Sequence, residues 1–596
     1  MPKNTLDTIP KRLDFAADNS ETGIIFVGTK GEENLRSWMT IRAHAISTAV
    51  FLENIAKQNN ISLTQEKRVA IILPTCPEFF DVFFGCQYIG AVPVPLYPPL
   101  RLGKMSEYIE KTVAMLVAAD AQMLVTNKQI SRILGEVVAQ YPLPLGLHIV
   151  EDIPYSKSSV QYDYQNQSSA HLAMAQFSSG TTVSPKPVGL THQQVLANTD
   201  IILDHIQGMV GCSWLPLYHD MGLIGCVFPA FSKMGTLVLI PPEEFLRRPA
   251  IWLQAISKHK AYISPAPNFA YSYCSKRIQN KDMEGVDLSC WKMALNGAEA
   301  VSPAHLREFI TKFGKYGFTK EALTPVYGLA EASLAVTFSA PHTEFISVCF
   351  DREKLLHGQA VRYIDTNTQD RSDLEPYVEL ACVGTPLREF FVEIRDEQNT
   401  IVPDATIGTI HIRGPSIMRG YLNQAQTGIS PIQDGWLDTG DMGFFFEGNL
   451  YIYGRKKDVI VLNGQNHAPQ DLEQAVDEID GVRQGCSVAV GETSSGGEKV
   501  YMFVETVSST QNNTQIAEQC RKAILAKTGI DCDLVVILQS GTIPRTSSGK
   551  LRRKETLRLF QLGQLLPPKD VNMWNMAGVL AKSAWGYLQS NFTKKD

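Results

Sequence analysis

The chain of 596 residues lacks the features that mark membrane, secreted and nucleic-acid-binding proteins. It has no uninterrupted apolar run of about 18 residues, and its most apolar window, VFFGCQYIGAVPVPLYPPL, is broken by prolines and polar residues. The polar N-terminal stretch MPKNTLDTIPKRLDFAADN contains no apolar core of a secretory signal. The net charge of −6 gives no reason to expect nucleic acid as a partner. We therefore expect no nucleic-acid binding and no stable membrane insertion.

Cysteine motifs for metal binding or redox chemistry are also absent from the sequence. The eleven cysteines are scattered singly from Cys76 to Cys532, and no two of them form a C-x-x-C pair. The sequence therefore indicates neither a zinc site nor a dithiol redox site. We expect reduced, mostly buried thiols in a cytoplasmic protein.

Charged residues are few, at 19%, and hydrophobic residues make up 44%, which is typical of a globular protein. The length exceeds what one hydrophobic core usually serves. Strand-length apolar runs recur between longer amphipathic segments. RVAIILP (68–74), AQMLVTN (121–127), GTLVLIP (235–241) and AYISPAP (261–267) predict buried strands, and EFFDVFFGCQYIGA (78–91) predicts a helix. This alternation favours α/β layers.

The sequence pattern changes twice in the second half of the chain. After Val383, apolar and polar residues alternate between turn signals, which favours antiparallel strands. After GRKKDVI (454–460) a smaller unit begins, with DLEQAVDEI and NTQIAEQCRKAILAKTG as predicted helices and CSVAVG and KVYMFVET as predicted strands. We predict a large N-terminal domain, residues 1–456, with layered α/β subdomains and a β-rich subdomain. A smaller, mobile α+β C-terminal domain, residues 457–596, is joined to it by a hinge.

The stretch QFSSGTTVSPKPVGLTH (176–192) has the composition of a phosphate-binding loop. It contains clustered hydroxyl side chains, a lysine, and a glycine that lets the backbone turn its N–H groups inward. It lacks the Gly-Lys-Ser/Thr ending of a Walker loop. An ordinary strand-to-helix turn has a similar composition, so the loop alone leaves both interpretations open.

Four further motifs accompany this loop. They are NGAEAVSP, VYGLAEAS, GWLDTGDMGFFFEGNLYIYGRKKDVIV and GTIPRTSSGKLRRKE. Together with the loop, they resemble the adenylate-forming superfamily of acyl-CoA synthetases, peptide-synthetase adenylation domains and luciferases. The resemblance runs from about Thr40 to Arg558, and five motifs in the same order are not expected by chance.

The resemblance implies a reaction in which a carboxylate attacks the α-phosphate of ATP and yields an acyl-adenylate and pyrophosphate. The loop at 178–187 would hold the β- and γ-phosphates, Tyr327 would stack on adenine, and Asp441 would accept hydrogen bonds from the ribose hydroxyls. The implied nucleotide-binding residues are Ser178, Ser179, Gly180, Thr181, Thr182, Gly297, Ala298, Glu299, Tyr327, Gly328, Leu329, Asp441 and Arg455.

Three residues are implied to be catalytic, with ATP and Mg²⁺ as cofactors. Glu331 would be the metal ligand, since Mg²⁺ prefers oxygen ligands and neutralises charge on the phosphates. Lys550 would bridge the carboxylate and the α-phosphate as a point charge, at a place where negative charge develops. His219 is the third.

Each of these assignments has a structural alternative. Glu331 can pair on a helix surface, Asp441 can belong to the turn-rich DTGD segment, and Arg455 can be part of a solvated run of charges. The loop also departs from the commonest family pattern, which has glycine at the positions of Val183 and Pro187. Valine adopts positive φ only at a cost, so we expect this loop to close differently.

The segment SWLPLYHDMGLIG (213–225) indicates a medium- or long-chain fatty acid as the substrate. It resembles fatty acyl-AMP ligases and their long-chain CoA ligase relatives, in which this segment lies between the nucleotide and the acyl tunnel. The implied acyl-binding residues are His219, Asp220, Met221 and Gly222. A tight turn with a structural histidine is the alternative.

A segment of about 40 residues, 342–381, separates ASLAVTFSAP from CVGTPL. It resembles an insertion of the fatty acyl-AMP ligases, whereas CoA ligases usually have a shorter connection here. An insertion packed against both domains would hinder the closure that admits CoA. A plain surface loop is the alternative, because long insertions cost little stability.

The resemblance also places a hinge at Lys457, where related enzymes swing the small domain between adenylation and transfer. The residues after LRLFQLGQLLPPKD are too few for a folded carrier domain, so we expect a separate acyl carrier protein as acceptor. A candidate docking surface for this partner is the basic run of Arg545, Lys550, Arg552, Arg553, Lys554 and Arg558. The amphipathic stretch NMWNMAGVLAKSAWGYLQSNF is expected to be a helix docked on its own domain.

Two other functions remain open. A fatty acyl-CoA synthetase would consume the adenylate with CoA. A non-catalytic regulator would bind nucleotide or acyl-AMP on the same fold. Glu331, Asp441 and Lys550 argue against the regulator, because a binding module does not need the charge that serves the displacement.

Overall fold

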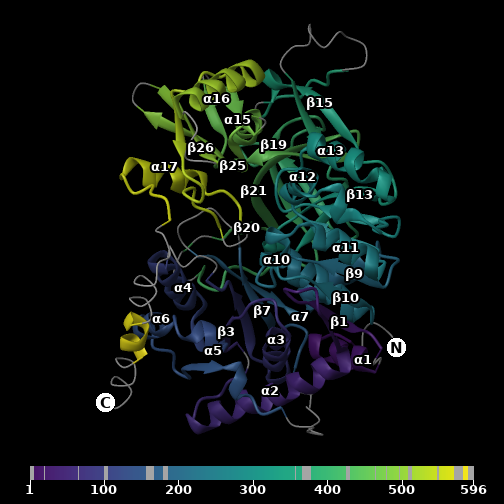
Figure 1. The fold of residues 1–596 in the computed structure, drawn as a ribbon, viewed down its shortest axis with the longest axis vertical. Coiled ribbons are helices and arrows are strands. Elements are labelled where there is room, and N and C mark those ends of the chain that lie inside the picture. Colours follow the sequence, from purple (N-terminus) through teal and green to yellow (C-terminus); the bar gives the residue numbers. More distant parts are fainter. Residues whose placement is uncertain are drawn as a thin grey trace.

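The computed structural model describes residues 6–18, 21–64, 66–99, 105–155, 167–178, 185–355, 357–365, 377–424, 428, 430–462, 465–477, 479–494, 497–507, 513–546, 549–568 and 581–587 (Figure 1). The α/β class is confirmed, with a large N-terminal domain built on parallel sheets, a β-rich part and a smaller C-terminal domain.

The largest sheet has nine strands in the order β17-β14-β13-β12-β11-β9-β10-β1-β2. Its central strands run parallel and its edge strands antiparallel. The strands are β1 (Gly23–Val27), β2 (Glu33–Ser37), β9 (Val210–Ser213), β10 (Thr236–Leu239), β11 (Ile263–Ala266), β12 (Met293–Asn296), β13 (Leu323–Gly328), β14 (Ala335–Phe338) and β17 (Thr385–Pro386). In such a sheet, ligands bind beyond the carboxyl ends of the parallel strands. The predicted acyl-binding residues follow β9, and the predicted residues 297–299, 329 and 331 follow β12 or β13.

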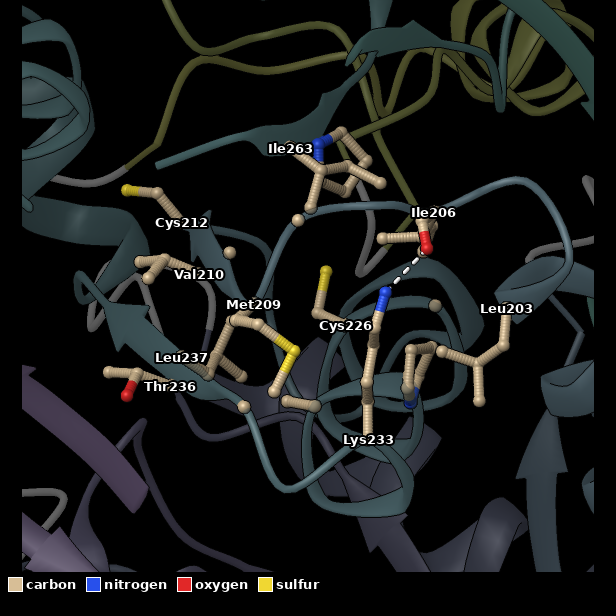
Figure 2. Close-up of a pocket in the computed structure, with 17 residues that line it drawn as sticks. Leu203, Ile206, Met209, Val210, Cys212, Cys226, Lys233, Thr236, Leu237 and Ile263 are labelled. Atoms are coloured by element: carbon tan, nitrogen blue, oxygen red, sulfur yellow. Dashed lines mark hydrogen bonds between the residues drawn. The ribbon is translucent and has the colours of Figure 1, made fainter. Parts of the chain in front are cut away.

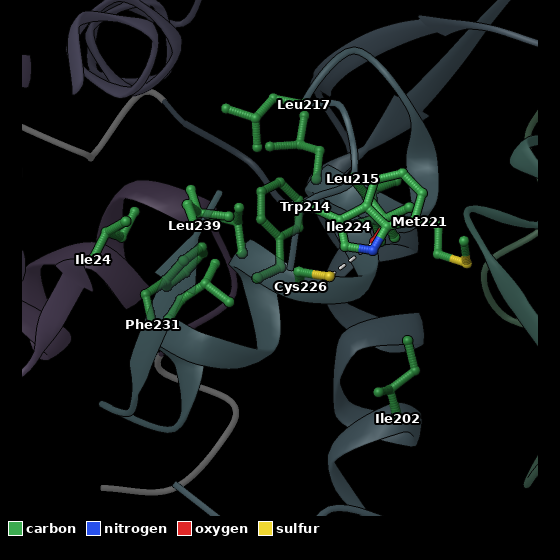
Figure 3. Packing of buried hydrophobic residues seen from close by; sticks show 14 of the residues in the cluster. Ile24, Ile202, Trp214, Leu215, Leu217, Met221, Ile224, Cys226, Phe231 and Leu239 are labelled. Carbon is green, nitrogen blue, oxygen red and sulfur yellow. Dashed lines mark hydrogen bonds between the residues drawn. The ribbon is translucent and has the colours of Figure 1, made fainter. Parts of the chain in front are cut away.

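Helices pack against this sheet and enclose an aromatic core. Figure 3 shows part of this core, in which Trp214 lies among Leu215, Ile224 and Cys226. The ring of Trp214 also stacks on Phe245, with 3.8 Å between centroids. The helices are α1 (Ile9–Ala17), α2 (Trp38–Gln58), α7 (His192–Leu203), α8 (Asp220–Gly222), the π-helix η4 (Leu223–Val227), α9 (Phe228–Ser232), α10 (Pro242–Arg247), α11 (Ala250–His259), α12 (Asn268–Arg277) and α13 (Pro303–Phe313).

A second, parallel sheet of four strands has the order β4-β3-β5-β6. Its elements are β3 (Arg68–Ile72), α3 (Pro77–Ile89), β4 (Val92–Leu96), α4 (Met105–Ala119), β5 (Ala121–Thr126), α5 (Lys128–Ser131), α6 (Gly135–Gln140) and β6 (Leu147–Ile149). The strands predicted at 68–74, 121–127, 235–241 and 261–267 and the helix predicted at 78–91 are confirmed as β3, β5, β10, β11 and α3. A separate antiparallel hairpin pairs β7 (Leu172–Phe177) with β8 (Pro187–Thr191).

The antiparallel strands predicted after Val383 form the β-rich part of the molecule. They are β18 (Phe391–Arg395), β19 (Gly408–Arg413), β20 (Ile432–Gln433), β21 (Trp436–Phe446) and β22 (Asn449–Arg455). The predicted insertion contributes an antiparallel pair of its own, β15 (Ser347–Asp351) with β16 (Tyr377–Ala381).

The C-terminal domain has its own core, in which Ile460, Leu472, Val504 and Ile524 are buried together. Its elements are β23 (Ile460–Leu462), β24 (Gln465–His467), α15 (Pro469–Val476), β25 (Val482–Ser494), β26 (Gly497–Thr506), α16 (Asn513–Thr528), β27 (Leu534–Leu538) and α17 (Arg553–Gln561). The helices and strands predicted here are confirmed. Among the described residues of the whole chain, no helix has the length and apolar character of a membrane span.

The C-terminal segment docks on a different partner from the one expected. Residues 581–587 lie beside α5 and α6 of the large domain (Figure 1). The Gly135 N–H donates to Ser583 Oγ at 2.8 Å, and Tyr587 Oη donates to the Ser131 carbonyl at 2.6 Å. The two backbones touch, because a Cβ atom on Gly586 would overlap the Gly135 carbonyl. The expectation that this segment covers its own small domain is therefore wrong for these residues.

Candidate functional site

Two strand ends of the large sheet bring the predicted adenine-slot residues together. Gly297 follows β12 and lies so close to β13 that a Cβ atom would stand 2.8 Å from Val326 Cγ2. Ala298 adopts φ +69°, in the left-handed region that few non-glycine residues occupy. This sharp exit turns the chain across the end of β13, where Tyr327 lies.

Tyr327, Asp441 and Arg455 form one hydrogen-bonded cluster. Tyr327 Oη donates to Asp441 Oδ2 at 2.8 Å, and Arg455 Nε donates to Asp441 Oδ1 at 3.1 Å. The pairing of β21 with β22 sets Asp441 opposite Arg455, and β13 supplies Tyr327 from the other sheet. Burial, and next the charge of Asp441, raise the pKa of Tyr327 well above its usual value, so its hydroxyl remains a donor. Three of the predicted nucleotide-binding residues are thus brought together.

Glu331 is held by a tyrosine that the sequence did not single out. It lies in the 3₁₀ turn η8 (Ala330–Ala332), just after Gly328. A side chain at Gly328 would overlap the Leu334 carbonyl, so glycine is needed there. Tyr421 Oη donates to Glu331 Oε1 at 2.9 Å. Because 90 positions separate the two residues, sequence spacing gives no sign of this contact.

Lys186 lies beside the same tyrosine. Its ammonium nitrogen stands 5.1 Å from the centre of the Tyr421 ring, within reach of a cation–π interaction. Burial lowers the pKa of Lys186, as do the charges of Lys457 and Arg455, while Glu331 opposes them. The end of the predicted phosphate loop therefore lies near Glu331 and Arg455.

The rest of the predicted phosphate loop is only partly described. Ser178 follows β7, and its N–H donates to the Lys186 carbonyl at 3.1 Å, which closes the base of the hairpin. Ser179, Gly180, Thr181, Thr182 and Val183 lie outside the described residues, so their roles stay predictions.

Lys550 reaches this edge of the large domain from the C-terminal domain. A tight loop presents it: the Thr546 N–H donates to the Lys550 carbonyl at 2.8 Å, and Gly549 has φ +87°. Burial and the charge of Arg455 lower the pKa of Lys550. The carboxylates of Asp220, Glu299 and Asp441 act in the opposite direction. These influences place the lysine among the predicted nucleotide- and acyl-binding residues.

His219 and Asp220 form an ion pair at the start of α8. His219 Nδ1 lies 2.6 Å from Asp220 Oδ1, and the Met221 N–H donates to Asp220 at 2.7 Å. Burial alone would raise the pKa of Asp220, but His219 and then Lys550 lower it below its usual value. Gly222 is required by packing, since a Cβ atom would overlap the Pro216 carbonyl. The four predicted acyl-binding residues thus form one turn, and the charge of Lys550 acts on its Asp220.

Glu299 completes the ring of charge around Lys550. It accepts a hydrogen bond from the Phe269 N–H at 2.7 Å, at the start of α12. Its side chain is open to solvent, yet the crowding of protein atoms around it raises its pKa, an effect that the charge of Lys550 opposes.

An apolar pocket opens directly after the acyl-binding turn (Figure 2). The chain continues from α8 into the π-helix η4, where Cys226 Sγ donates to the Met221 carbonyl at 3.2 Å. π-Turns of this kind recur at functional sites. The pocket has a cavity volume of about 40 Å³ and lies between this helix and strands β9, β10 and β11. Its lining is apolar apart from Lys233 and Thr236.

The predicted insertion contacts both domains. Phe350 packs on Phe444 of β21, with 5.0 Å between ring centroids. Arg352 Nη1 lies 2.7 Å from Asp471 Oδ2, which belongs to α15 of the C-terminal domain, and both side chains are about nine-tenths buried. Ala468 of the same domain is buried in the cluster that contains Phe350. No pattern in the sequence indicates this ion pair.

Part of the basic run proposed for carrier docking is engaged in contacts within the protein. Arg553 pairs with Glu473 at 2.7 Å and with Asp458 at 3.3 Å. Arg558 pairs with Glu555, Arg545 donates to the Gly549 carbonyl, and Arg552 is buried. Arg552 and Arg553 are therefore poor candidates for an exposed docking surface, whereas Lys554 and Arg558 of α17 are exposed and stay candidates.

Comparison with known proteins agrees with this arrangement. The chain matches the family described as AMP-binding enzyme over residues 58–422, and the AMP domain described as Disco-interacting protein 2-like over residues 457–567. It is 30% identical to the medium-chain-fatty-acid–[acyl-carrier-protein] ligase JamA of Moorena producens, over 94% of this chain and 95% of that protein. It is 32% identical to 4-hydroxyphenylalkanoate adenylyltransferase of Mycobacterium tuberculosis, over 85% of this chain and 84% of that protein.

Solved structures give the same answer. A structure from a study of fatty acyl-adenylate ligases from E. coli and L. pneumophila matches with a TM-score of 0.82 and 30% identity, covering 93% of this chain and 98% of that one. The chain belongs to the AMP-binding enzyme family and is an AMP-forming ligase of the adenylate-forming superfamily.

Proposed function

We propose that this enzyme activates a medium- or long-chain fatty acid with ATP, forms acyl-adenylate and pyrophosphate, and passes the acyl group to a separate acyl carrier protein. The proposal rests on the charges of Asp441, Arg455 and Asp220 that act on Lys550, and on the apolar pocket whose lining residues Gly225 and Cys226 follow the His219–Asp220 pair in the chain. The similarity to the JamA ligase, named for a medium-chain fatty acid and an acyl carrier protein, supports the same substrate and acceptor.

In this mechanism a carboxylate oxygen of the fatty acid attacks the α-phosphorus of ATP. The bond to the bridging oxygen breaks, and pyrophosphate leaves with the electron pair. Lys550 stabilises the negative charge that develops on the α-phosphate oxygens, and Asp441 accepts hydrogen bonds from the ribose. Tyr327 and Arg455 hold Asp441 in place for that task. Ser178 to Thr182 bind the leaving phosphates.

The residues present fit a magnesium ion bound together with the nucleotide. Mg²⁺ is usually held by one or two carboxylates, with phosphate oxygens and waters completing its shell. Glu331 supplies one carboxylate, oriented by Tyr421, and Lys186 stands next to that tyrosine. The ion would neutralise phosphate charge when bound.

The pocket beyond Gly222 suits the acyl chain. Its apolar lining begins one helical turn after the His219–Asp220 pair, so a carboxylate at the pair and a chain in the pocket are compatible. A chain of methylene groups buried there gains about 0.8 kcal/mol for each group that leaves water.

The small domain is proposed to move about Lys457. Arg455 is fixed in β22, whereas Asp458 pairs with Arg553 of the small domain. The change of partner falls between these two residues, and Lys457 lies exposed in the turn that joins them. A match of the second family that begins at residue 457 supports a domain boundary at the same place.

The insertion is proposed to restrict that movement and so to disfavour CoA as acceptor. Its Arg352 grips Asp471 of the small domain while Phe350 anchors it in the large domain. A carrier protein brings its own docking contacts to offset this restraint. A cytoplasmic location is part of the proposal, since all eleven cysteines are free thiols.

Fatty-acid-dependent exchange of labelled pyrophosphate into ATP tests the first half-reaction. We expect exchange with decanoate or dodecanoate and none without fatty acid. Binding of nucleotide with no exchange for any acid would instead identify a non-catalytic regulator. The CoA synthetase alternative is distinguished by separating the acyl products formed with and without CoA.

A further inference from the structure

A charged side chain bars the end of the apolar pocket that lies away from the reacting groups. Lys233 caps the C-terminus of α9, and its Nζ donates to the Ile206 carbonyl at 2.5 Å, as Figure 2 shows. Ile206 follows α7, which packs against α9, so the lysine side chain joins two neighbouring elements that both contribute to the pocket lining. Lys233 is the one charged residue in the pocket lining.

The helical segment from the acyl-binding turn to Lys233 sets the length of the pocket. Gly222 ends α8, and Lys233 follows after η4 and α9, roughly 15 Å further along a helical axis. An extended acyl chain of medium length spans such a distance. Beyond Lys233, the lining residue Met209 is half exposed, so a longer chain would emerge at the surface there.

We propose that the Lys233 side chain blocks the end of the pocket and so sets the upper limit of acyl-chain length. This inference rests on the proposed function and adds a residue that determines specificity. An acyl chain that extends past Lys233 must displace its ammonium group from the carbonyl of the buried Ile206. That carbonyl would then lose its hydrogen-bond donor. Lys233 is partly buried, and this burial lowers its pKa.

The test compares the full-length wild type with Lys233→Ala and Lys233→Met. Pyrophosphate release is measured with straight saturated acids from hexanoate to hexadecanoate, and kcat/KM is plotted against chain length. Both variants should extend the profile upward, with kcat/KM for the longest acids rising about tenfold or more and little change for medium-length acids. Alanine removes the blocking side chain. Methionine keeps a similar volume but cannot donate a hydrogen bond to the Ile206 carbonyl. Lys281→Ala, at an exposed lysine of the same domain, should keep the wild-type profile.

Three results would overturn the role of Lys233. They are an unchanged profile in both variants, an equal loss at every chain length, and a selective loss of activity with ω-carboxylated acids while the saturated series stays the same. Thermal unfolding of each variant establishes that it is folded. Failure of the proposed function has a different signature, since the wild type would then release no pyrophosphate with any acid.

Discussion

Charges of both signs act on Lys550: Arg455 lowers its pKa, and Asp220, Glu299 and Asp441 raise it. A cation held in this way needs little rearrangement when charge develops on the α-phosphate. We predict that Lys550→Ala lowers the rate of acyl-AMP formation by a factor of hundreds, with an unchanged thermal unfolding temperature. Lys554→Ala, four positions further, is the matched control and should keep most of the activity. Near-normal acyl-AMP formation by Lys550→Ala would remove this lysine from the mechanism.

Tyr421 gives a second prediction because it orients the proposed metal ligand. Tyr421→Phe deletes the hydroxyl that donates to Glu331 and leaves the ring beside Lys186 in place. A hydrogen bond to a charged group is worth about 1.5–3 kcal/mol, so the Mg²⁺ concentration for half-maximal activity should rise about tenfold. The measurement is pyrophosphate release during a Mg²⁺ titration, with Tyr363→Phe in the insertion as the control. The same Mg²⁺ dependence in Tyr421→Phe and wild type would show that the contact has no part in metal binding.

At the scale of structural elements, the insertion gives a specific prediction about the use of CoA. If the Arg352–Asp471 pair restrains the small domain, its loss should admit CoA. The double variant Arg352→Met/Asp471→Asn removes both charges, because a single change would leave a buried charge without a partner. We predict that it still forms acyl-AMP and also makes acyl-CoA at high CoA. A restraint of about 3 kcal/mol already reduces the competent population more than 100-fold, so its loss should be easy to detect.

The control for this experiment lies in the same insertion. Arg362 pairs with Asp351, so its partner belongs to the insertion and not to the small domain. Arg362→Met should therefore leave the product unchanged. Equal acyl-CoA yields from the double variant, Arg362→Met and wild type would refute the restraint.

The helices and strands were easier to predict from the sequence than the contacts between distant parts of the chain. The apolar runs that became β3, β5, β10 and β11 are buried on both faces, which gives a strong local signal. The position of residues 581–587 depends on close contact between Gly586 and Gly135, which no periodic pattern encodes. Motifs likewise indicated Asp441 and Glu331, but Tyr421 and Arg352 act through contacts between distant parts of the chain.

For the molecule as a whole, the proposed function requires two arrangements of the two domains, one for adenylation and one for transfer, and a hinge at Lys457. Lys457→Pro fixes φ near −65° and should oppose the rotation. We predict that acyl-AMP formation is retained and that transfer to a carrier protein is lost. Lys457→Ala, which removes the side chain but keeps a free backbone, should transfer normally. Equal loss of both half-reactions in the proline variant would point to misfolding or to a hinge elsewhere.

The acyl products of the intact protein show directly whether the acyl group goes to a carrier protein or to CoA. The intact protein is incubated with ATP, Mg²⁺ and dodecanoate, alone, with CoA, or with a phosphopantetheinylated acyl carrier protein, and the acyl products are separated. We predict that acyl-AMP accumulates both in the absence and in the presence of CoA, with little acyl-CoA even at high CoA, and that the acyl group moves to the carrier protein. Rapid formation of acyl-CoA by the unmodified enzyme would contradict transfer to a carrier protein as its function and identify a fatty acyl-CoA synthetase.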